Sequence, residues 1–293
     1  MTAMVQQDTE QSGGAAFAFV QRLAGELSGG KLELPSSPEV VMRVRDALRD
    51  PDVTAAGLAR VVGSEPALAA RIMHLAASFA INPEGRKVSD LRHAITMMGF
   101  NNLRSAAMAF AIAQLRDASR LQSVRERLTE VWMQSIMVAS VSQAVARRQA
   151  VLNADEAMLA GLMHGVGKLY ILGRADTCPE LFEDEVSLGQ VLRGWHASIG
   201  RAILEAWGFP DAVAEAVGQQ DDVERAVSGH VDITDVLIVG VLIASYAAYP
   251  QDLELNLHGV RSVSRLGLDA PTCAAVLKES ESEVQSLRVA LGA

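Results

Sequence analysis

The chain has 293 residues, of which 49% are hydrophobic and 21% are charged, and its formal net charge is -9. This length suffices to bury a large core, and the acidic balance disfavours a general binder of nucleic acid or of anionic membranes. Cys178 and Cys273 lie far apart in no metal or redox spacing, which favours a reduced setting. The first thirteen residues lack a leader pattern, and no apolar run spans a bilayer comfortably, so we expect a soluble, cytoplasmic protein.

The first 115 residues are expected to form short helices joined by brief turns. A polar, Gln- and Gly-rich segment at 1–14 comes first and predicts a disordered tail. Glycine, proline and asparagine mark the turns, and no segment has a convincing strand pattern. The expected helices are Ala15–Leu27, Pro38–Leu48, Thr54–Val62, Pro66–Phe79, Asp90–Met98 and Asn102–Leu115.

The rest of the chain is also predicted to be helical. Ser119–Arg148 contains neither proline nor glycine, which predicts one long helix or two nearly continuous ones. Asp155–Leu172 is apolar on every side, so we expect one buried central helix there. Further helices are expected at Ser187–Trp207, Asp211–Val217, Thr234–Tyr249, Arg261–Leu266 and Pro271–Leu291. The predicted fold class is therefore all-α.

The central segment carries the residues with the most chemistry. Its glycines cost helix stability but allow neighbouring helices to come close. His164 is its only imidazole, and Lys168 follows one turn later on the same face. Two interpretations stay open for each. His164 is either a core histidine satisfied by one hydrogen bond or a ligand, and Lys168 is either a solvated charge or a phosphate contact.

Several blocks of sequence, in a fixed order, resemble the HDOD family, bacterial signalling relatives of the HD metal-dependent phosphohydrolases. They include LPSSPEVVMRVRDALRDPDV, VSDLRHAITMMGFNNLRSAAMAFA, AGLMHGVGKLYIL and GWHASIGRAILEAWGFP, and extend from about Lys31 to Val223. The resemblance implies an N-terminal bundle of short helices packed with a degenerate HD-type core. The implied division is a tail and leading helix (1–30), an N-terminal lobe (31–118), an HD-like core (119–250) and a C-terminal helical extension (251–293).

The same resemblance implies that the metal site has been lost. HD enzymes hold metal ions with histidines, a His-Asp pair and a later aspartate, and a catalytic zinc-type site needs about three protein ligands. Here only two imidazoles remain at these positions and no carboxylate does. We therefore predict no metal, no cofactor and no hydrolysis. The family's ligand positions fall on Gln134, His164, Gly165, His196, Gln219, Gln220 and Ser245.

The expected function is that of a non-catalytic bacterial signalling or regulatory protein that acts through protein–protein contacts. One alternative is a sensor for a nucleotide or phosphate, or a residual phosphohydrolase, that uses the vestigial cleft. A second is a helix-turn-helix regulator built on Thr54–Ser78, although its second helix offers DNA only Arg71 and His74 among apolar residues. Arg86, Lys87, Arg92 and Arg104 could also meet an acidic partner. The candidate cleft residues are Gln134, His164, Lys168, His196, Gln219 and Gln220.

Overall fold

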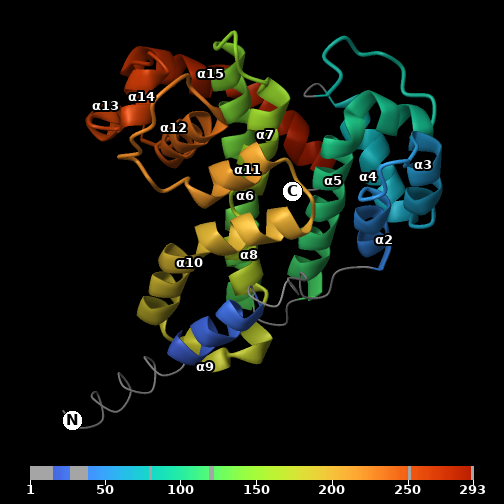
Figure 1. Cartoon of the computed structure of the whole chain (residues 1–293), viewed down its shortest axis with the longest axis horizontal. Helices are drawn as coiled ribbons and strands as arrows, with labels where there is room; N and C mark the ends of the chain where they lie inside the picture. Colours follow the sequence, from blue (N-terminus) through green and yellow to red (C-terminus); the bar gives the residue numbers. More distant parts are fainter. Residues whose placement is uncertain (1–15, 27–38, 79–80, 119–121, 250–251, 292–293) are drawn as a thin grey trace.

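The computed structural model describes residues 16–26, 39–78, 81–118, 122–249 and 252–291. These ranges contain helices and no strand, so the all-α prediction is confirmed for them (Figure 1). The predicted tail at 1–14 lies outside them. After a helix at residues 16–26, the elements are α2 (Glu39–Ala47), α3 (Ala55–Gly63), α4 (Pro66–Ala77), α5 (Leu91–Ala118), α6 (Gln122–Arg147), α7 (Ala154–Met163), α8 (Val166–Leu172), the short 3-10 helix η1 (Ala175–Thr177), α9 (Pro179–Glu183), α10 (Glu185–Ala206), α11 (Asp211–Gly218), α12 (Ile233–Ser245), α13 (Leu253–Leu257), α14 (Arg261–Arg265) and α15 (Ala270–Leu291).

The long helix α6 runs through the middle of the molecule, and α7, α12 and α15 pack along it (Figure 1). Small residues make this packing close. A Cβ on Gly161 of α7 would lie 2.6 Å from the Cα of Ala139 on α6, so the two backbones meet where only glycine fits. Helices α2 to α4 pack against α5 as a separate group. None of the described helices is long and apolar enough to cross a membrane.

The N-terminal group follows the predicted order of helices. Helix α5 bends at Gly99, which has φ 77° and ψ 166°. The break between the predicted helices Asp90–Met98 and Asn102–Leu115 is therefore confirmed at Gly99. In the α3–α4 hairpin, the guanidinium of Arg71 lies over the ring of Phe110, 5.6 Å from its centroid. Arg71 is therefore engaged inside the group of helices and not presented to a groove of DNA.

The prediction of one continuous central helix is wrong, because the chain turns at His164 and Gly165 between α7 and α8. A continuous helix would bond the carbonyl of His164 to the N–H of Lys168. Here that carbonyl accepts a hydrogen bond from Nε2 of Gln220 instead, at 3.0 Å. Gly165 lowers the cost of leaving the helix at this point.

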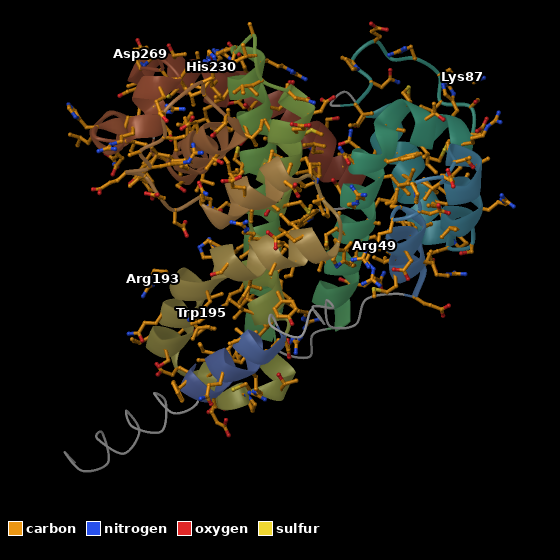
Figure 2. The ribbon with its side chains drawn as sticks, viewed as in Figure 1. Arg49, Lys87, Arg193, Trp195, His230 and Asp269 are labelled. Carbon is orange, nitrogen blue, oxygen red and sulfur yellow. The ribbon has the colours of Figure 1, made fainter. Side chains whose placement is uncertain are left out.

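The N-terminal group contacts the rest of the chain through α4 with α15, through α5 with α6 and α7, and also at the turn after α10. The side chain of Arg49 lies at this boundary and donates to the carbonyl of Ala206 (Figure 2). Arg104 is only 8% exposed, and its guanidinium lies 5.5 Å from the ring centroid of Phe209. Arg104 therefore does not belong to a surface basic patch, whereas Lys87 projects from the loop before α5 (Figure 2).

Candidate functional site

His164, Lys168, His196 and Asp221 form one electrostatically coupled group, here called the histidine cluster. His164 lies at the α7–α8 turn and is 1% exposed. Its Nδ1 lies 2.7 Å from the carbonyl oxygen of Gly161, which can only accept, so Nδ1 carries the proton. Burial lowers the pKa of His164 to about 4, although the Gly161 carbonyl acts in the opposite direction. The ring is therefore neutral near pH 7.

His196 on α10 is 4% exposed and is tied to a carboxylate. Its Nε2 donates to Oδ2 of Asp221 at 2.9 Å, and this hydrogen bond holds the pKa of Asp221 below its usual range. Nδ1 of His196 is buried and has no hydrogen-bond partner among the described residues. The sequence analysis missed Asp221. The signal available was its position directly after Gln219 and Gln220 in the loop that follows α11.

Lys168 on α8 is half-buried beside this pair. Desolvation lowers its pKa, and the nearby charge of Asp221 opposes that shift. Its ammonium group makes no hydrogen bond or close ion pair with any residue that the structure describes. The structure thus brings together three of the residues singled out from the sequence, His164, Lys168 and His196, and adds one carboxylate that was not.

The remaining predicted residues serve other contacts. Gln220 is buried and donates to the carbonyls of His164 and Val217, so it fixes the loop to the α7–α8 turn. Gln219 faces the other way: its Nε2 donates to Glu215 and its Oε1 accepts from Nε of Arg225 at 3.0 Å. Gln134 is half-buried on α6. Ser245 is exposed at the end of α12 and donates to the carbonyl of Val241.

The side chains around His164 do not fit the metal ions that the resemblance to HD enzymes implies. A Cβ at Gly165 would lie 2.8 Å from Oγ of Ser135 and 2.8 Å from a methyl of Val131, so a carboxylate side chain has no room there. A Cβ at Gly167 would lie 1.9 Å from the carbonyl oxygen of His196, so the backbones of α8 and α10 touch. Across the described ranges, no group of three or more His, Cys, Asp or Glu side chains is arranged to hold a metal ion.

The buried His164 predicts a stability that depends on acidity. Its folded pKa of about 4 lies below the ordinary value of 6.5, so the unfolded chain takes up the proton first as the pH falls. The contribution of the neutral His164 ring to the free energy of unfolding is complete above pH 6.5. It is lost as the pH falls from 6.5 to 4, and the total loss is about 3 kcal/mol. We expect His164→Asn to remove that part of the slope in urea unfolding measured across this range. The same substitution at the exposed His258 is the control, and an unchanged slope in His164→Asn would contradict the assignment.

Comparisons with known proteins agree with this architecture. The family model described as HDOD domain matches residues 34–223. A solved structure from Shewanella amazonensis, described provisionally as a metal-dependent phosphohydrolase, is 28% identical with a TM-score of 0.68, over 95% of this chain and 99% of that one. An HDOD domain protein of unknown function from Geobacter sulfurreducens is 24% identical with a TM-score of 0.58, over 92% and 96%, and shares the fold.

A curated relative, an uncharacterized protein of Treponema pallidum, is 20% identical over 212 residues. The match takes in 67% of this chain but only 39% of that relative, so the chain spans about two fifths of its length. The family model, by contrast, covers well over half of the present chain. Because this match covers well over half of the chain and the described ranges contain helices alone, the chain belongs to the HDOD family.

Proposed function

We propose that this protein is a non-catalytic regulatory HDOD protein that acts through contacts with other proteins. The observation that carries the proposal is the space around Gly165. The position that would need the carboxylate of a His-Asp pair is filled by Ser135 and Val131 of α6. A catalytic metal centre needs about three ligands and an open position. Position 165 supplies no carboxylate, and the carboxylate that is present nearby, Asp221, is bonded to His196.

The two imidazoles do not carry the proposal. Nδ1 of His164 is bound to the Gly161 carbonyl and Nε2 of His196 to Asp221, which leaves the other nitrogen of each ring available, so the proposal rests on the missing carboxylate at position 165. The Shewanella amazonensis protein carries a hydrolase description, and that description applies to that protein. Membership in the HDOD family favours a regulatory role here, and a surface that binds other proteins needs none of the buried donors.

The proposal predicts that addition of metal changes nothing. With Mn²⁺, Zn²⁺ or Fe²⁺ in excess, we expect no saturable binding by calorimetry and no hydrolysis of bis(p-nitrophenyl) phosphate. We also expect the partners that a tagged chain retains from cell extract to stay bound when His164 and His196 are both replaced by asparagine. Hydrolysis that requires metal, and that the double variant loses, would contradict the non-catalytic role. Loss of every partner in a folded double variant would contradict a contact surface that is independent of the buried histidines, and a parent chain that retains no specific partner would contradict the contact role.

A second candidate function is an anion sensor at the histidine cluster. The specific observation is the half-buried Lys168, whose ammonium group makes no hydrogen bond or close ion pair with the described residues. A phosphate could accept from the Lys168 ammonium group. In that case phosphate binding should be lost in Lys168→Met and should strengthen at a pH where the lysine is fully charged. Equal phosphate binding by the variant and the parent would exclude this candidate.

A further inference from the structure

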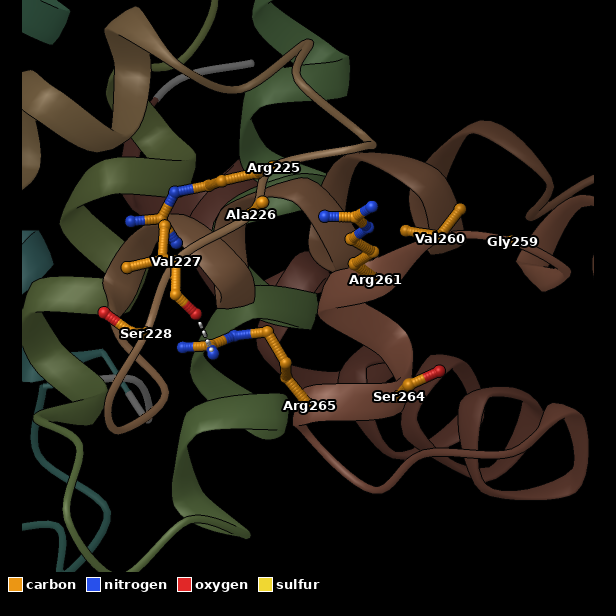
Figure 3. Close-up of a pocket in the computed structure, with 9 residues that line it drawn as sticks. All are labelled: Arg225, Ala226, Val227, Ser228, Gly259, Val260, Arg261, Ser264 and Arg265. Atoms are coloured by element: carbon orange, nitrogen blue, oxygen red, sulfur yellow. Dashed lines mark hydrogen bonds between the residues drawn. The ribbon is translucent and has the colours of Figure 1, made fainter.

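A pocket of about 560 Å³ lies between the loop after α11 and the short helix α14 (Figure 3). Three arginines are its only charged lining residues. We propose that this pocket binds a small organic phosphate, a ligand independent of the histidine cluster and of the proposed protein contacts. Its volume falls within the range of small-molecule sites. The lining residues are Arg225, Ala226, Val227, Ser228, Gly259, Val260, Arg261, Ser264 and Arg265.

Two of the arginines form a fixed wall. Arg225 is 7% exposed; its two Nη atoms donate to Asp232 at 2.9 and 2.6 Å. Arg265 donates through Nε to Asp235 at 3.0 Å and through its Nη atoms to the carbonyls of Val227 and His230 (Figure 3). These bonds clamp the 227–230 loop onto α14, so the pocket is formed before any ligand arrives.

Arg261 is the arginine available to a ligand. Its side chain is exposed, and it makes no hydrogen bond or ion pair with the described residues. Figure 3 shows it projecting from α14 toward the Arg225–Val227 segment on the opposite side of the pocket. The hydroxyls of Ser228 and Ser264 also line the pocket, but Figure 3 shows both pointing away from the Arg261 guanidinium. The contact assigned to the phosphate is therefore the guanidinium of Arg261, whose donors bind no other described residue.

The charges around the pocket favour an anion. The carboxylates of Asp232 and Asp235 offset Arg225 and Arg265, but neither aspartate lines the pocket. Asp235 is fully buried behind the arginines. Glu215 acts on Arg225 as well, but it too lies outside the lining. The overall charge of the chain is -9. A pocket with an all-positive charged lining is therefore a local exception on an acidic protein.

The apolar part of the lining defines the rest of the ligand. Ala226, Val227 and Val260 add methyl groups beside the arginines, and the pocket is much larger than one phosphate ion. An organic phosphate fits this combination, because its phosphate can bind Arg261 while its carbon skeleton covers the valines. The Nε of Arg225 donates to Oε1 of Gln219, so this arginine is held by a further contact besides Asp232.

The test uses phenyl phosphate as the probe, with inorganic phosphate and phenol as its two halves. We expect saturable binding of phenyl phosphate by calorimetry, weaker binding of inorganic phosphate and none of phenol. Arg261→Gln should weaken phenyl phosphate binding by about tenfold or more, the usual effect of losing one charge-assisted contact. Arg60→Gln is the matched control, because Arg60 is an exposed arginine on α3 at the far side of the molecule (Figure 1).

Each other result overturns the proposal. No binding of phenyl phosphate at millimolar concentration would exclude the site, and unchanged affinity in Arg261→Gln would place the ligand elsewhere. An equal loss in Arg60→Gln would indicate attraction to overall charge only. If inorganic phosphate bound as tightly as phenyl phosphate, the pocket would recognise the phosphate group alone, and the proposed contact with the carbon skeleton of the ligand would be wrong. Lys168→Met should leave the affinity unchanged, and a loss there would assign the binding to the histidine cluster instead.

Discussion

Replacing Gly167 by alanine is expected to destabilise the protein by about 4 kcal/mol or to prevent folding, because among the described glycines this one has the closest neighbouring atom to an added methyl group. The added Cβ would lie 1.9 Å from the carbonyl oxygen of His196 and 2.9 Å from the backbone nitrogen of Gly200. Both obstacles are backbone atoms, so α8 and α10 must separate to accept the methyl group, and overpacking of this kind costs several kcal/mol. The midpoint of urea unfolding, together with the yield of soluble protein, measures the effect.

Gly194 provides the matched control on α10. It is exposed, it lies in the same helix as His196, and a Cβ built there meets nothing within 4 Å. Gly194→Ala should therefore stabilise the protein by about 0.5 to 1 kcal/mol, because alanine has the higher helix propensity. If Gly167→Ala were tolerated as well as Gly194→Ala, the direct backbone contact between α8 and α10 would be refuted.

Asp235→Asn is expected to cost about 3 kcal/mol or more. The Asp235 side chain is 1% exposed, and its oxygens accept from Ser262 at 2.9 Å and from Nε of Arg265 at 3.0 Å. One oxygen also lies 3.3 Å from Nη1 of Arg225, so a single carboxylate faces two guanidiniums. The neutral amide of asparagine leaves the guanidiniums of Arg225 and Arg265 without their shared buried carboxylate. Removing one partner of a buried ionic group costs several kcal/mol. Thermal unfolding of the variant beside the parent measures the loss.

A substitution in an exposed ion pair is the control. It shows what the loss of a carboxylate costs when that carboxylate is not part of the buried Asp235 network. Asp46 on α2 pairs with the neighbouring Arg45 at 2.9 Å, and its side chain is 61% exposed. Asp46→Asn should change stability by less than about 0.5 kcal/mol, since exposed pairs contribute little. Equal destabilisation by the two substitutions would refute a special role for the Asp235 network. Asp235→Asn should also weaken binding in the Arg261 pocket, because Arg265 would no longer be held in place.

Most of the helices could be predicted from the sequence, because their signals are local, whereas the short helices η1, α9 and α13 were not expected. Thr54 caps α3 and Asn153 caps α7 through side-chain oxygens, and both boundaries were expected within one residue. The break in α5 at Gly99 could also be foreseen, since glycine there adopts a positive φ. The break between α7 and α8 could not. It depends on Gln220, which lies 56 residues further along the chain and takes the carbonyl of His164.

The candidate site was predictable only in part for the same reason. His164 and Lys168 are one turn apart, so their common face followed from helical spacing. That His196 joins them agrees with the resemblance to the family, but Asp221 as its partner depends on where the loop after α11 folds back. Gln219 was expected to face the same site, whereas Arg225, six residues later, turns it away. Polar loop residues have no periodicity that assigns them to one side.

The filled space beside Gly165 also bears on how the chain could change over many generations. A return to a His-Asp pair needs an aspartate at 165, but Ser135 and Val131 stand 2.8 Å from its first carbon. Such a reversion is harmful until α6 changes as well, and changes in α6 made first bring no activity and open a void. If the proposed non-catalytic role is correct, an aspartate at 165 would therefore need changes at 131 and 135 at the same time, and the order of these substitutions decides whether each intermediate folds.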